Sequence, residues 1–121
     1  MQSFPSEYFS RAELACPCCG KCDMDPGFIV ALDAVRKAYG KPMVITSGYR
    51  CFSHNASVGG VKGSAHLVGK AVDVRTTAEE AGKLIPVAKL HGITGIGHGH
   101  TFTHIDTSHA PAHGQPVEWH Y

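Results

Sequence analysis

Two short segments carry residues that could hold a metal ion. In the first, Ser64, His66 and Asp73 follow the pattern S-x-H-x-x-G-x-A-x-D. In the second, FTHID, His104 precedes Asp106 by two positions. Two neutral imidazoles and one carboxylate would supply three protein ligands and leave the fourth tetrahedral position for water, as catalytic zinc requires. The spacing therefore predicts a zinc site at His66, Asp73 and His104, and it favours a hydrolase.

The elements that carry these residues are expected to be short strands. In residues 71–75, the alternation of side chains turns Asp73 to one face and two valines to the other. A buried carboxylate needs a partner, and the two candidates are a metal ion and a salt bridge, such as one to a lysine. In residues 102–106 the same alternation places His104 and Asp106 on one face, so the ligand and its neighbouring acid are presented together.

Capping residues predict the helices. Ser10 and Glu13 form a capping box that opens a short helix, and Thr77 and Glu80 form another. The clearest helix, over residues 26–39, begins at Asp25-Pro26 and ends before Gly40. Pro86 lies inside the last helix and removes a backbone donor, so we expect a kink or an early break there.

The remaining segments predict strands and loops around the site. A strand over residues 43–46 delivers Arg50 just beyond its end, where we expect its side chain to be exposed and to meet a ligand. The glycine-bearing loop over residues 51–63 is long enough to suggest a function. Residues 93–97 are expected to form another strand, and residues 117–121 to cover an edge of the core.

Composition excludes several classes of protein. The chain has 121 residues, 43% of them hydrophobic, and a formal net charge of +1, so no basic surplus suggests nucleic acid. No apolar run approaches the roughly 18 residues of a membrane span, and the first residues lack the regions of a signal peptide. We therefore expect one domain over residues 1–121, a monomer made in the cytoplasm. Nine histidines, five of them between His98 and His113, point to metal or proton chemistry unless they are a solvated cluster.

Four of the five cysteines, Cys16, Cys18, Cys19 and Cys22, lie close together in the sequence. They could hold a structural zinc ion, but C-x-C-C-x-x-C differs from the paired C-x-x-C of a zinc ribbon. Buried or disulfide-bonded cysteines, with Cys51 as a partner across the fold, are the favoured interpretation. A cysteine-rich domain for nucleic acid is disfavoured by the near-neutral charge and the lack of a basic, aromatic surface.

Four ordered motifs resemble those of a known family. They are TSGYR at 46–50, N-x-x-V-G-G at 55–60, S-x-H-x-x-G-x-A-x-D at 64–73 and H-I-D at 104–106. Together they resemble the zinc D-Ala-D-Ala carboxypeptidases and related M15 peptidases, above all the short, often phage-borne M15A-type members. The likeness extends over nearly the whole chain.

The resemblance implies an α+β fold shared with the hedgehog signalling domain, with helices beside a small antiparallel sheet that bears zinc. It implies His66, Asp73 and His104 as zinc ligands. It also implies that the substrates are stem peptides of bacterial peptidoglycan, cleaved at a D-amino-acid-containing bond. Arg50 resembles the family arginine that meets a substrate carboxylate or carbonyl oxygen, and Ser64 resembles a serine near bound substrate.

One position departs from the family pattern and leaves the general base open. Many relatives carry Glu or Asp three residues before the last zinc histidine, where this chain has Thr101. Asp106 is the first candidate because it shares a face with His104, although it could instead orient an imidazole. His100 and then His98, on a glycine-rich turn, are the next candidates. A zinc-stabilised module that binds wall peptides without hydrolysing them is the alternative function.

Overall fold

Five strands form one sheet in the computed structural model, which describes residues 4–111 and 113–121. The strands, in the spatial order β1-β2-β4-β3-β5, are β1 (Ile45–Ser47), β2 (Ala71–Arg75), β4 (Phe102–Asp106), β3 (Gly95–His98) and β5 (Val117–His120). The helices are α1 (Arg11–Leu14), α2 (Pro26–Tyr39), α3 (Phe52–Ser57), the 3-10 helix η1 (Ala65–Val68) and α4 (Ala78–Leu90). The α+β fold class predicted from the sequence is confirmed.

The sheet is mixed, which corrects the expectation of a purely antiparallel one. Strands β1, β2, β4 and β3 pair antiparallel, but β5 runs parallel to β3. The reason is that β4 ends beside the start of β3, with Asp106 opposite Gly95. The chain then passes to the other edge of β3 at that same end, where Val117 pairs with Gly95, so β5 must run in the direction of β3.

The predicted capping residues begin the helices as expected. The side chain of Asp25 accepts the N–H of Phe28 at the start of α2, and Gly40 ends that helix in the left-handed conformation at φ 74°. Ser10 and Thr77 each form the predicted capping box.

The expected early break at Pro86 is wrong, because α4 continues through it to Leu90. Proline leaves the carbonyl four residues earlier without its usual partner. That residue is Gly82, and both Gly82 and Pro86 are exposed to solvent. Water can therefore satisfy the freed carbonyl, and the apolar face of the helix, on Leu84 and Ala88, keeps its place in the core.

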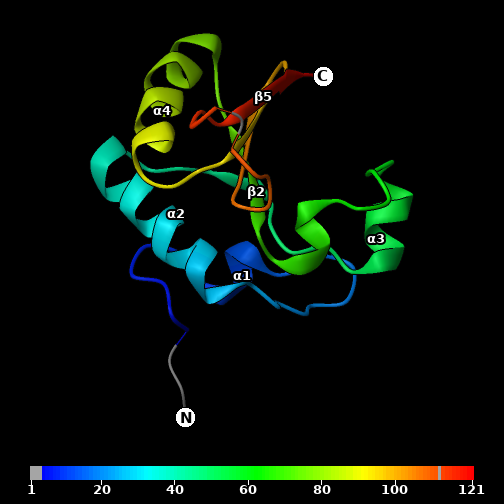
Figure 1. The fold of residues 1–121 in the computed structure, drawn as a ribbon. Coiled ribbons are helices and arrows are strands. Elements are labelled where there is room, and N and C mark those ends of the chain that lie inside the picture. The colour runs from blue at the N-terminus through cyan, green and yellow to red at the C-terminus, as the bar shows by residue number, and fades with distance from the viewer. Residues whose placement is uncertain (1–3, 112) are drawn as a thin grey trace.

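The core lies between the sheet and the two long helices. Figure 1 shows α2 and α4 side by side on one side of the sheet, with η1 and α3 towards the other. Alternation in the central strands gives this core the side chains Val72, Val74, Ile96 and Ile105. The opposite face of the same strands carries Asp73, His104 and Asp106, so burial of the apolar face fixes the direction of the acidic and histidine side chains.

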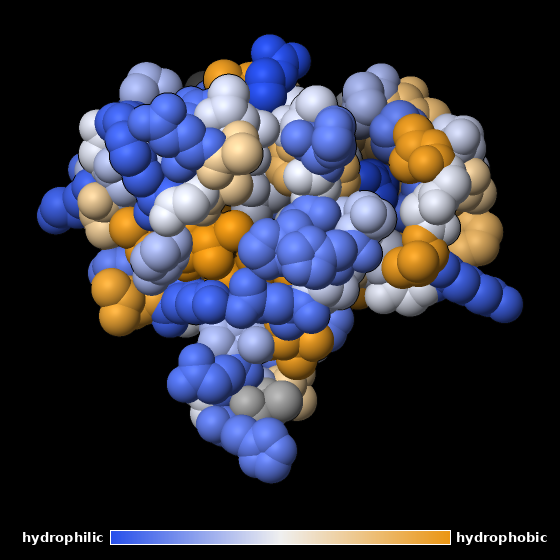
Figure 2. All heavy atoms as spheres, turned by 90° about the horizontal axis from the view of Figure 1, so that it is seen from above, coloured by the Kyte–Doolittle hydropathy of each residue, from blue (hydrophilic) through white to orange (hydrophobic). Residues whose placement is uncertain are grey.

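The surface viewed in Figure 2 is largely polar, with apolar residues in separate patches between the polar ones. Within residues 4–111 and 113–121, no helix combines the length and the apolar character needed to cross a bilayer.

Candidate metal centre

Two strands and one short helix bring the three predicted ligands together. Asp73 of β2 lies directly opposite His104 of β4 in the antiparallel register. His66 comes from η1, where the Ser64 hydroxyl accepts the His66 N–H at 3.2 Å. Gly69 ends η1 at φ 70°, and a Cβ there would lie 2.7 Å from Met24 Cα, so η1 is packed tightly against the chain that precedes α2.

The donor atoms of His66, Asp73 and His104 lie within 4.8 Å of one another. Asp73 Oδ1 is 3.3 Å from His66 Nε2 and 3.0 Å from His104 Nδ1. All three residues are largely buried, with His66 only 2% exposed. Among the described residues no fourth His, Cys, Asp or Glu joins this group. The arrangement is that of a three-ligand site with one position left open.

The far nitrogen of each imidazole is held by a hydrogen-bond acceptor. His66 Nδ1 lies 2.8 Å from the carbonyl oxygen of Gly48, and His104 Nε2 lies 2.6 Å from Asp106 Oδ2. In a neutral imidazole the nitrogen that donates to such an acceptor carries the proton, which leaves the lone pair on the other nitrogen. The lone pairs of both rings are thereby directed toward Asp73 Oδ1. This donor set fits Zn²⁺, which binds imidazole nitrogen and carboxylate oxygen.

Without a metal ion, the same contacts shift the titration of the ligands. Burial opposes ionisation of Asp73, but hydrogen bonds from His104 and His66 outweigh it and lower the pKa of its carboxyl. Burial likewise opposes the charged form of His104, but hydrogen bonds to Asp106 and Asp73 outweigh it and raise the pKa of the imidazole. A bound cation would replace the proton between these groups.

Asp106 is completely buried, and both of its oxygens accept hydrogen bonds. Oδ2 accepts from His104, while Oδ1 accepts from the Ser108 N–H at 3.1 Å and from His109 Nδ1 at 2.8 Å. Burial disfavours the charged form of this carboxyl, but hydrogen bonds from His104 and His109 lower its pKa. Both oxygens accept hydrogen bonds from neighbouring groups. This geometry suits the second role considered for Asp106 from the sequence, that of orienting an imidazole.

Arg50 does not have the exposed side chain expected beyond a strand end, because that side chain is only 13% exposed. Its Nε donates to Ser47 Oγ at 2.9 Å, and its two terminal nitrogens donate to Asn55 Oδ1 and to Asp73 Oδ2, each at 3.2 Å. The salt bridge considered for Asp73 is therefore made by an arginine and not by a lysine. Two of the five N–H groups of Arg50 remain for another acceptor.

A cavity of about 410 Å³ opens beside the three ligands. Its lining comes from the η1 region, from β4 and from the segment after it: Val61, Gly63, Ser64, Ala65, His104, Asp106, Ser108, His109 and Trp119. Ser64 is thus placed where the resemblance implied, at the edge of the site. Of the three potential ligands, His104 lines the cavity, and Asp73 links it to His66 and Arg50 through the contacts given above.

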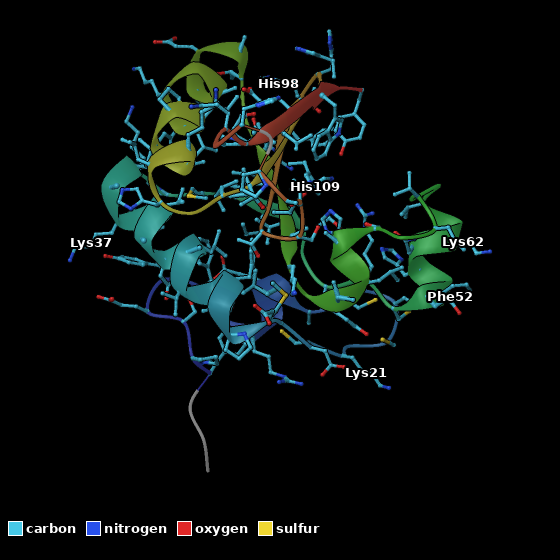
Figure 3. All side chains as sticks on the ribbon, in the orientation of Figure 1. Lys21, Lys37, Phe52, Lys62, His98 and His109 are labelled. Carbon is cyan, nitrogen blue, oxygen red and sulfur yellow. The ribbon has the colours of Figure 1, made fainter. Side chains whose placement is uncertain are left out.

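His109 and Trp119 line the cavity, although neither was expected at the site from the sequence. The ring of His109 is 5.0 Å from that of Trp119, which also lies 5.2 Å from His104. The His109 side chain is 40% exposed, and Figure 3 shows it near the middle of the molecule, away from His98. The signal available in the sequence was its position three residues after Asp106, in a chain rich in histidine.

The two other histidines proposed as bases are not brought to the cavity. His100 is exposed in the turn after β3 and does not line the cavity. His98 Nε2 is 2.9 Å from Glu118 Oε1, and its ring stacks on His120 at 4.5 Å. Thr101 is exposed in the same turn.

A small α+β domain with two histidines and one aspartate converging on the polar face of its sheet is of the class of zinc-binding hydrolase domains. The family described as peptidase M15 matches residues 7–106, and the chain belongs to this family. It is also similar to the zinc D-Ala-D-Ala carboxypeptidase of Streptomyces albus G, with 36% identity over 66 residues. That match covers 54% of this chain but only 26% of the relative, so the chain spans about a quarter of its length.

Proposed function

We propose that this protein is a zinc-dependent peptidase that hydrolyses D-amino-acid-containing peptide bonds in the stem peptides of bacterial peptidoglycan. The observation that supports this most strongly is a pair of hydrogen bonds made by the ring nitrogens that face away from Asp73. His66 bonds in this way to the carbonyl of Gly48, and His104 to Asp106. They orient both imidazoles towards Asp73 before any metal ion binds. The name of the Streptomyces relative supports the choice of substrate.

The three-ligand geometry supports hydrolysis over the alternative, a module that binds wall peptides around a structural ion. Structural zinc sites usually have four protein ligands, whereas catalytic sites keep one position for water or substrate. Within the described residues, the potential ligands that converge at this site are His66, Asp73 and His104, and the cavity opens beside His104. Bound zinc would acidify a water molecule and polarise the scissile carbonyl.

We assign the proton-accepting role to His109. Its Nδ1 donates to Asp106, so Nε2 is the unprotonated nitrogen, on a half-exposed ring at the cavity wall. A base held by a buried carboxylate in this way can take a proton and return it to the leaving amine. Asp106, the first candidate from the sequence, would then orient both His104 and His109.

Arg50 and Ser64 complete the proposed substrate contacts. The two N–H groups of Arg50 that have no acceptor among the described residues can meet a substrate carboxylate or the developing oxyanion. The Ser64 oxygen accepts from His66 N–H, and its own proton remains available to a substrate carbonyl. All of these groups come from one chain, so we propose that the enzyme acts as a monomer.

The cell wall is the proposed place of action, reached from the cytoplasm with the help of a phage lysis system or after release of the cell contents. Incubating zinc-loaded protein with purified peptidoglycan and defined stem peptides, with and without chelator, tests the activity. Mass spectrometry of the products is expected to show chelator-sensitive fragments, whose masses identify the bond. Retention of wall peptide without fragments would instead support the binding module.

A further inference from the structure

A second group of metal-binding side chains lies outside the proposed active site. The sulfur atoms of Cys16, Cys19 and Cys51 lie within 4.8 Å of one another. Cys16 and Cys51 are 35 positions apart and come together because the loop between α1 and α2 passes beneath α3 (Figure 1). Figure 3 shows Lys21 of that loop on the same side of the molecule as Phe52 of α3.

The loop that carries Cys16 and Cys19 folds back on itself around a sulfur atom. The N–H of Cys16 donates to the carbonyl of Lys21 at 2.7 Å, and the N–H of Gly20 donates to the carbonyl of Cys16 at 2.8 Å. Gly20 has φ 75°, in the left-handed region that favours glycine. This tight loop brings the Cys19 sulfur within 4.8 Å of the Cys16 sulfur.

Backbone donors also surround the sulfurs from the other side. The N–H of Cys51 lies 3.5 Å from Cys16 Sγ, and the N–H of His54 lies 3.4 Å from Cys51 Sγ. A sulfur that accepts backbone N–H donors is favoured as a thiolate, the form that binds soft metal ions.

The membership of this cluster differs from the set considered from the sequence. Cys22 is buried among the core residues and is not part of the group, whereas Cys51 takes its place. Cys18 is exposed and lies in the same loop, between Cys16 and Cys19. Cys16 and Cys19 have the C-x-x-C spacing that is common in zinc sites.

We propose that Cys16, Cys19 and Cys51 bind a second Zn²⁺ ion, with Cys18 in the fourth position, as a structural site. A disulfide would use two of these sulfurs and leave the others unexplained, whereas a tetrahedral zinc site uses all four. All five cysteines are free thiols in the structure. The proposal does not depend on peptidase activity.

The position of the site explains what it would do for the fold. Cys51 directly follows Arg50, and the preceding Tyr49 donates its N–H to the carbonyl of Leu14 at 2.8 Å. An ion shared by Cys16 and Cys51 would therefore fasten the segment that carries Arg50 to the N-terminal loop. In this way it would limit the movement of the guanidinium behind the active site.

Metal counting and cobalt spectroscopy test the proposal on the full chain purified under reductant. We expect two zinc ions per chain in the unmodified protein and one in Cys51→Ser. The Cys22→Ala variant, matched as a cysteine outside the cluster, is expected to keep two. Cys18→Ser is expected to lose the second ion more readily to a chelator, and retention equal to that of the unmodified protein would remove Cys18 from the ligand set.

Cobalt(II) substitution of the unmodified protein keeps the test valid even if Cys51→Ser fails to fold. Thiolate ligands give sulfur-to-cobalt charge-transfer absorption in the near ultraviolet, which a site of two histidines and one aspartate cannot give. We expect this absorption in the unmodified protein and in His104→Ala, whose other site is damaged. A single ion without thiolate absorption, or a Cys16–Cys51 disulfide that persists in reductant, would overturn the proposal.

Discussion

The substitution Gly95→Ala should disable the metal centre without touching a ligand. A Cβ at position 95 would lie 2.5 Å from both Asp106 Oδ2 and His109 Nδ1, closer than real Cβ contacts occur. The carboxylate cannot yield freely, because Asp106 is completely buried and accepts hydrogen bonds from His104 and His109. The methyl group must therefore displace the carboxylate that orients the His104 ring.

The size of the effect follows from that hydrogen bond. Loss of an acceptor behind a metal-binding histidine costs roughly 10- to 100-fold in metal affinity, equivalent to about 1.4 to 2.7 kcal/mol. Overpacking of a fixed interior site costs a further 1 to 3 kcal/mol or so in the free energy of unfolding. Gly95→Ala should thus lower both the zinc affinity and the stability of the metal-free protein.

Chelator competition for zinc and thermal unfolding after chelation measure the two effects separately. Gly82→Ala is the matched control, since a Cβ there meets nothing within 4 Å on an exposed helix turn. That control should leave zinc affinity unchanged and add about 0.5 to 1 kcal/mol of stability. Zinc affinity in Gly95→Ala equal to that of the unmodified protein would refute the role assigned to Asp106.

Three further predictions concern the base, the zinc ion and the β5 edge. His109→Ala should reduce kcat by roughly 10²-fold or more while zinc content stays unchanged; an unaltered kcat would remove His109 from the mechanism. Chelation should lower the melting temperature, since zinc at 100-fold above its Kd contributes about 2.7 kcal/mol; an unchanged value would contradict a metal site in the fold. Hydrogen bonds from Lys89 and His98 lower the pKa of Glu118 from its ordinary value of 4.5. The ionised carboxylate therefore stabilises the protein at pH values above 4.5, and this contribution is lost as the pH falls through the lowered pKa. Because the pair is about one-third exposed, Glu118→Gln should cost less than about 1 kcal/mol at neutral pH, with the difference from the unmodified protein vanishing as the pH falls; a pH-independent difference in denaturant midpoint would contradict this.

Local signals made much of the fold predictable. Asp25, Pro26 and Gly40 act within one helix turn of the ends of α2, so the sequence contains the whole capping geometry. The side-by-side placement of Asp73 and His104 was predictable for a similar reason, because alternation in β2 and β4 fixes their faces once the valines and isoleucine face the core.

Contacts between distant segments account for what the sequence did not predict. Cys51 lies beside Cys16 across 35 positions, and Arg50 is paired with Asp73 across 23 positions, which no local spacing indicates. The pairing of His109 with Asp106 depends on how the chain turns after β4. Position 95 must be glycine because the Asp106 carboxylate lies against it, a contact that the sequence alone does not reveal.

The central claim, that His66, Asp73 and His104 hold the zinc ion that hydrolyses wall peptides, is tested most directly by one measurement. Release of fragments from purified peptidoglycan would be compared by mass spectrometry for the zinc-loaded protein, for His104→Ala and for His100→Ala, a histidine outside the cavity. We predict fragments from the unmodified protein and from His100→Ala, abolished by chelator and restored by zinc, and none from His104→Ala. Fragment release by His104→Ala at the rate of the unmodified protein would contradict the account.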